Sequence, residues 1–70
     1  MKFKKANLSV AEVASVMHTD PQTIRVMLQQ GIVPWGKAWK RPGSSHYTYI
    51  ISPKRFYDET GMVLGGVEDD

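Results

Sequence analysis

The sequence predicts a mainly α-helical fold with one small β-hairpin, in the order α-α-β-β-α. Three observations support this prediction. Helix-start signals occur at three places, glycines follow the expected helix ends, and the apolar spacing changes from helical to alternating between the second and third helices. The chain has 70 residues, the size of one small domain. We therefore expect a single hydrophobic core.

Two helices are predicted in the first half of the chain. Ser9 and Glu12 have the spacing of a capping box. An apolar stripe at helical spacing follows: Val10, Val13, Ala14 and Met17. The second helix starts with Asp20 as its cap and Pro21 at its first position, and Gly31 is expected to end it. Its inward residues are Ile24, Met27 and Leu28.

A hairpin and a closing helix are predicted in the second half. Aromatic and β-branched residues alternate on both sides of the turn cluster Pro42–Ser45, which predicts strands at Trp35–Lys40 and Tyr47–Ile51. Ser52 and the proline after it repeat the cap-plus-proline start, and Gly61 closes this third helix. The alternation of the aromatic residues favours core packing over base stacking on single strands: Trp35, Trp39, Tyr47, Tyr49, Phe56 and Tyr57.

Composition limits the class of protein. Hydrophobic residues make up 41% and charged residues 23% of the chain, as in a folded globular protein. The absence of cysteine excludes a disulfide framework and a thiolate zinc site, and suits a cytoplasmic protein. No apolar run approaches the ~18 residues of a membrane span, and polar residues interrupt the N-terminal region, so we expect no membrane association and no targeting signal.

The charges are unevenly distributed. Residues 1–61 carry all nine Lys and Arg residues but only four of the seven acidic residues, which gives this part a net charge of +5. Such an excess on a small domain suits a polyanion-binding module, although many soluble proteins are basic without binding one. We divide the chain into a basic N-terminal arm at 1–7, a domain at 8–61, and an acidic, disordered tail at 62–70.

Catalysis is not expected. Enzymes need convergent groups, and the only histidines, His18 and His46, fall in an interhelical turn and at the hairpin tip, without metal-ligand spacing. Gly65 and Gly66 precede no phosphate-binding Lys-Ser or Lys-Thr pair. We therefore predict a binding protein with no metal, cofactor or small-molecule ligand.

The predicted surface suits double-stranded DNA. The major groove of DNA is wide enough to admit an α-helix such as the second one. The outward side chains of this helix can contact bases and phosphates: Gln22, Thr23, Arg25, Val26 and Gln29. The hairpin can act as a wing that follows the backbone or enters the minor groove, through Lys37, Lys40, Arg41, Ser44, Ser45 and His46. Lys54 and Arg55, in the first turn of the third helix, are candidates for a phosphate contact.

Simpler interpretations of the same residues stay open. Gln, Thr and Arg side chains cover the solvent face of many amphipathic helices, and lysines on a hairpin discourage edge-to-edge aggregation. The side chains of Lys54 and Arg55 can extend into water. On either interpretation the fold itself is unchanged.

The order of elements is that of a small winged helix-turn-helix, and the residues resemble one family with this fold. The segments that carry the resemblance are Leu8–Ala14, Thr23–Arg25, Gly31–Pro34 and Tyr47–Pro53. They are similar to the excisionases of phages and transposons, which share their fold with the MerR-type regulators. The chain has Val26 and Met27 where MerR-type regulators usually carry aromatic residues. We expect it to have no long dimerisation helix of the kind that those regulators carry.

The resemblance implies a recombination directionality factor that bends attachment-site DNA so that an integrase excises the element. A small phage transcriptional repressor is the alternative, and an adaptor that binds a host protein through the aromatic hairpin is a third. Because one small module contacts few base pairs, we expect monomers that assemble cooperatively on adjacent DNA sites.

Overall fold

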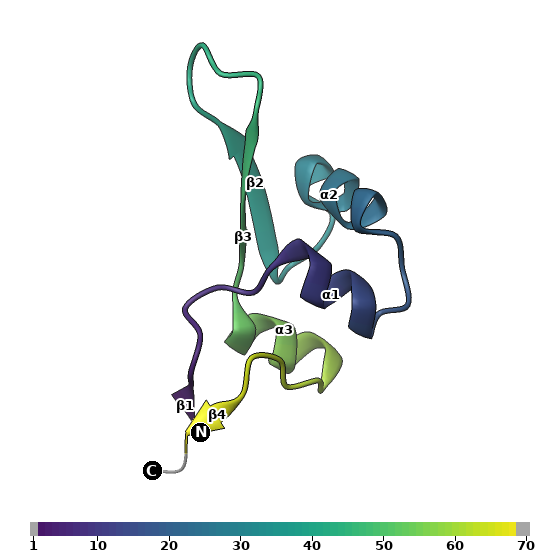
Figure 1. The fold of residues 1–70 in the computed structure, drawn as a ribbon, viewed down its shortest axis with the longest axis vertical. Coiled ribbons are helices and arrows are strands. Elements are labelled where there is room, and N and C mark those ends of the chain that lie inside the picture. Colours follow the sequence, from purple (N-terminus) through teal and green to yellow (C-terminus); the bar gives the residue numbers. More distant parts are fainter. Residues whose placement is uncertain (1, 69–70) are drawn as a thin grey trace.

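The computed structural model describes residues 2–68, and within them the predicted order of three helices and a hairpin is confirmed (Figure 1). The helices are α1 (Val10–Val16), α2 (Pro21–Gln30) and α3 (Pro53–Thr60). The hairpin strands are β2 (Gly36–Lys40) and β3 (Tyr47–Ile51). The structure adds two strands that the sequence analysis did not predict, β1 (Lys2–Phe3) and β4 (Val67–Glu68).

The predicted helix caps are present. The Ser9 hydroxyl accepts a hydrogen bond from the Glu12 backbone N–H at 3.0 Å, and the Glu12 carboxylate accepts one from the Ser9 N–H at 3.1 Å, which completes the capping box. Asp20 caps α2, and Ser52 caps α3. These side chains supply acceptors for backbone donors that a helix start otherwise leaves unpaired. The three helix starts are therefore fixed by local sequence.

The turn between α1 and α2 is short and is closed by hydrogen bonds at the end of α1. His18 adopts a left-handed conformation with φ of 53°, the only non-glycine among residues 2–68 to do so. The Thr19 N–H bonds the Ala14 carbonyl at 2.9 Å, and the His18 N–H bonds the Ser15 carbonyl at 3.2 Å. This pair of bonds is a Schellman motif, which ends a helix and turns the chain sharply. The two helices therefore follow each other with only a short connection.

The core lies where the three helices meet the base of the hairpin. Eight residues form it: Leu8, Val13, Ala14, Ile24, Leu28, Trp35, Ile51 and Phe56. Phe56 is fully buried, and its ring meets the Trp35 ring edge to face at 5.2 Å between centroids. Burial of apolar side chains such as these is the main favourable contribution to folding.

The hairpin projects from this core beside α2, and its turn is the most distant part of the molecule (Figure 1). Its base lies close to α2 because Gly36 has no side chain. A Cβ at this position would lie 2.8 Å from a Leu28 methyl group and 2.8 Å from the Ile50 carbonyl oxygen. Gly36 therefore sets how closely the hairpin approaches α2.

The segment after Gly61 differs from its prediction as a disordered tail. Met62 and Leu64 pack against the core, and β4 pairs antiparallel with β1, which also gives the basic arm a fixed place. In this pairing Phe3 lies opposite Val67, and the centroid of the Phe3 ring is 6.0 Å from that of the Tyr57 ring. The difference arises because the segment contains apolar residues among its glycines and acids, and burial of these side chains against the core holds the segment in place. Asp69 and Asp70, also part of the predicted tail, lie outside the described residues.

Among residues 2–68, no helix has the length and apolar character needed to cross a membrane.

Candidate nucleic-acid interface

The outward face of α2 consists mainly of neutral polar side chains. Five residues on it are exposed: Gln22, Thr23, Val26, Gln29 and Gln30. Arg25 is half-buried, and its guanidinium donates a hydrogen bond to the Gln22 side-chain oxygen at 3.3 Å. The predicted outward residues of α2 thus share one face. Gln30 belongs to this face as well, although it was not among the predicted residues.

Gln29 connects α2 to the hairpin. Its side-chain amide nitrogen donates a hydrogen bond to the Tyr49 hydroxyl on β3 at 2.8 Å, across 20 residues of sequence. The Gln29 side-chain oxygen has no hydrogen-bond partner among the described residues. The contact therefore orients Gln29 and holds the hairpin at a defined position beside the α2 face.

The two sides of the hairpin differ because strand side chains alternate. On the α2-facing side, Ala38 pairs with Tyr49 and Lys40 pairs with Tyr47. The Lys40 ammonium lies over the Tyr47 ring, 4.9 Å from its centroid, and the ring centroids of Tyr47 and Tyr49 are 6.2 Å apart. Lys40 is thereby held on the side that α2 occupies, and the two tyrosines are further residues of this surface.

Lys37 lies on the opposite, outer side of the hairpin. The register places four residues there: Lys37, Trp39, Thr48 and Ile50. Trp39 is 40% exposed and Tyr47 on the other side is 38% exposed, so the expectation that both pack in the core is wrong. The strands extend beyond the helices, and at this distance no element covers either ring. Lys37 and Lys40, which were predicted to act together in the wing, therefore lie on opposite sides of the hairpin.

The tip loop, residues 41–46, is organised by its own hydrogen bonds. The Ser44 hydroxyl accepts from the His46 N–H at 3.1 Å, and the Ser44 N–H donates to the Arg41 carbonyl at 3.0 Å. Gly43 has φ of 83°, a conformation that favours glycine. The side chains of Arg41, Ser45 and His46 are exposed, and Ser44 is half-buried. A cation therefore stands at the start of an ordered, solvent-exposed loop.

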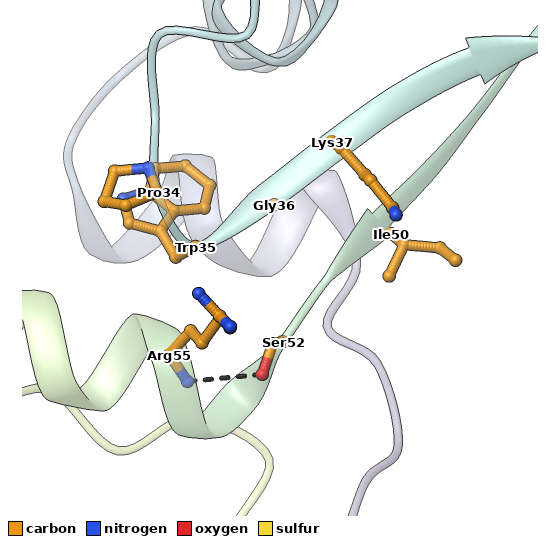
Figure 2. Close-up of a pocket in the computed structure, with 7 residues that line it drawn as sticks. All are labelled: Pro34, Trp35, Gly36, Lys37, Ile50, Ser52 and Arg55. Atoms are coloured by element: carbon orange, nitrogen blue, oxygen red, sulfur yellow. Dashed lines mark hydrogen bonds between the residues drawn. The ribbon is translucent and has the colours of Figure 1, made fainter.

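Lys54 and Arg55 have different surroundings. The Lys54 ammonium pairs with the Asp58 carboxylate one turn later at 3.1 Å, in an exposed ion pair. The Arg55 side chain lines a hollow of about 350 Å³ between α3 and the base of the hairpin (Figure 2). The structure therefore brings neither residue to the α2 face. Asp58 already partners one of these cations, which weakens the argument for a phosphate at this helix start.

Glu12, whose pKa is lowered in the folded chain, lies outside this surface. The hydrogen bond from the Lys5 ammonium to Glu12, 2.9 Å long, lowers the pKa of Glu12, and the bond from the Ser9 backbone lowers it further. This contact joins the N-terminal arm to the capping box of α1. No cluster of carboxylates and histidines suited to a metal ion is found within residues 2–68.

No protein-family model, curated protein or solved structure matches this chain.

Proposed function

We propose that the chain is a sequence-specific double-stranded DNA-binding protein with a winged helix-turn-helix, in which α2 is the recognition helix and the β2–β3 hairpin is the wing. One observation carries this proposal. An exposed, polar helix face lies beside a hairpin that holds Lys40 on the same side and Arg41 at its tip. A duplex presents bases and phosphates at the same time, and this surface offers groups for both.

The α2 face has the size and chemistry for direct readout. Ten helical residues span about 15 Å, and a helix of this width enters the major groove. Gln22 and Gln29 carry amides that can pair with adenine edges, and Arg25 can reach guanine. Thr23, near the helix start, suits a phosphate oxygen. Base contacts are thus assigned to α2.

The wing supplies the phosphate contacts. Lys40 and Arg41 are cations on or near the α2-facing side, and Ser44, Ser45 and His46 add polar groups at the tip. Contacts of this type fix register and orientation on the duplex without reading its sequence. Because Lys37 and Arg55 lie elsewhere, we leave them out of the proposed DNA interface.

The biological role that we infer is excision of a mobile element. The segments that resemble the excisionases include Thr23–Arg25 of α2 and all of β3, which belong to the elements of the proposed interface. In this role monomers bind adjacent sites, bend the attachment-site DNA and direct an integrase to excision. A small phage transcriptional repressor would use the same surface, and it remains the second candidate.

Binding is tested by selection from a pool of randomised duplexes, followed by anisotropy titrations at several salt concentrations. We expect one enriched sequence whose affinity falls as salt rises, because neutralised phosphates release counterions. Failure to enrich any sequence would reject the proposal. Arg25→Ala should cost about 1–3 kcal/mol of binding and relax the preference at one base pair.

The role is tested first by whether an integrase reading frame adjoins this gene, and then by an excision assay with that integrase. Excision is expected to require the protein. Equal product with and without it would reject the excisionase role, and footprinting over the element's promoters would then test the repressor.

A further inference from the structure

The outer side of the hairpin carries a surface that the proposed DNA interface does not use. Trp39 is 40% exposed there, between the exposed Lys37 on its own strand and Thr48 opposite it. At the hairpin base, Lys37 and Ile50 of this side line the hollow of about 350 Å³ described above (Figure 2). Trp39 does not line the hollow itself but lies on the same side of β2 as Lys37, which does, two residues further along the strand. Exposed tryptophans are common anchors of protein interfaces.

The hollow combines apolar walls with two cations. Its apolar walls come from Pro34, Trp35 and Ile50, and its cations are Lys37 and Arg55. In Figure 2 the Arg55 side chain rises from α3 toward the start of β2, between the two elements. No carboxylate is among the residues that line this hollow, and two acidic residues, Asp58 and Glu59, line an adjoining hollow that shares Arg55.

The position of this surface leaves it accessible when α2 contacts a ligand. Trp39 and Lys37 alternate with Ala38 and Lys40, whose side of the hairpin faces α2. A duplex bound along α2 and the tip loop would thus approach from the other side of the sheet. The two surfaces can be occupied together.

The chemistry favours a peptide over a nucleic acid. A phosphate backbone would satisfy Lys37 and Arg55 but would bury no apolar group against Ile50 and Pro34. A segment with an apolar side chain flanked by carboxylates matches both parts of the surface, since it fills the hollow and complements the two cations. The volume, near the lower end for ligand pockets, suits one or two side chains.

We propose that the outer side of the hairpin, formed by Trp39, Lys37, Ile50, Pro34 and Arg55, binds an acidic and apolar peptide segment of a partner protein. The proposal goes beyond DNA binding and does not depend on it. It makes the protein an adaptor that can hold a second protein while α2 and the wing tip occupy DNA.

The test is selection of displayed random twelve-residue peptides on the immobilised full-length chain. We expect enriched peptides that carry an apolar residue with two or more nearby carboxylates, and we expect labelled copies of them to bind in an anisotropy titration. Trp39→Ala, checked for folding by circular dichroism, should weaken this binding at least fivefold. Failure to enrich peptides, or enrichment of basic ones, would overturn the proposal.

Two double variants with the same change in net charge separate this surface from the DNA interface. The first variant, Lys37→Glu with Arg55→Glu, should abolish peptide binding. The second, Lys40→Glu with Arg41→Glu, should leave peptide binding unchanged. The first should lower DNA affinity less than the second. If the first pair weakens DNA binding as much as the second, or if DNA competes with the peptide, the outer side binds nucleic acid and the proposal fails. If the protein binds the peptide but not DNA, the peptide proposal is supported and only the proposed DNA-binding function is rejected. Concentration-dependent self-association that displaces the peptide would identify a second copy as the occupant and also overturn the peptide proposal.

Discussion

The base and the tip of the hairpin belong to the same two strands but are determined by different interactions. At the base, Gly36 lies against Leu28, and Ile51 is fully buried. At the tip, Lys40 and Tyr47 are exposed, and the loop beyond them is held by its own hydrogen bonds. The base is therefore constrained by packing, whereas residues at the tip can be substituted without disturbing the packing of the hydrophobic core.

This contrast separates stability from recognition along one element. Substitutions near the base should change the free energy of unfolding, and substitutions at the tip should change DNA affinity alone. Because a domain of this size gains only about 3–5 kcal/mol from its core, the two classes of effect should differ clearly.

The largest effect is expected from Phe56→Ala below the hairpin base. The side chain is fully buried against Trp35, and loss of a buried phenylalanine costs about 3–5 kcal/mol. We expect a chain that is largely unfolded at 25 °C by circular dichroism. The milder Phe56→Leu variant should stay folded with a lower midpoint in urea. Two variants with wild-type midpoints would show that the base is not constrained by this packing.

The next effect is expected from Gly36→Ala. The added methyl group would meet the Leu28 side chain and the Ile50 carbonyl at 2.8 Å, and overpacking of this kind costs about 1–3 kcal/mol. Because the Ile50 carbonyl belongs to β3, the methyl group would strain the pairing of β2 with β3 as well as the contact with α2, so the wing should be displaced and DNA affinity should fall as well. Unchanged stability and affinity in Gly36→Ala would contradict the close approach.

A smaller effect, confined to binding, is expected from Lys40→Ala with Arg41→Ala at the tip. Each lost phosphate contact should reduce the slope of log K against log salt by about 0.9 for duplex DNA, with no change in urea midpoint. The matched control is Lys2→Ala with Lys4→Ala, which removes the same charge at the end of the molecule opposite the tip (Figure 1). Equal effects of the two pairs would mean that net charge, and not the tip, controls affinity.

The same contrast explains which features the sequence could predict. The helix starts at Ser9, Asp20 and Ser52 depend on groups within three residues, so local patterns were sufficient to find them. The contact between Gln29 and Tyr49 and the pairing of β1 with β4 join residues distant in sequence, and no local pattern encodes them. The alternation of the strands predicted a hairpin but not which side would face α2, so the separation of Lys37 from Lys40 and the exposure of Trp39 required the structure.

The smallest effect is expected at Glu12, which lies in neither part of the hairpin and tests whether the arm adds to stability. The Lys5 ammonium and the Ser9 N–H lower the pKa of Glu12 in the folded chain, so the folded state binds its proton less readily than the unfolded state. This stabilisation is present above the pKa of Glu12 in the unfolded chain and is lost as pH falls through the lower, folded value. Urea midpoints measured from pH 7 down to pH 3 should decline less steeply for Glu12→Gln, which keeps an acceptor for Ser9 but does not titrate. Lys5→Met should give an intermediate slope, since it removes the larger of the two causes and leaves the cap. Identical slopes in all three proteins would show that the arm contributes nothing through this contact, and the stability of the domain would then depend on its core and the hairpin base alone.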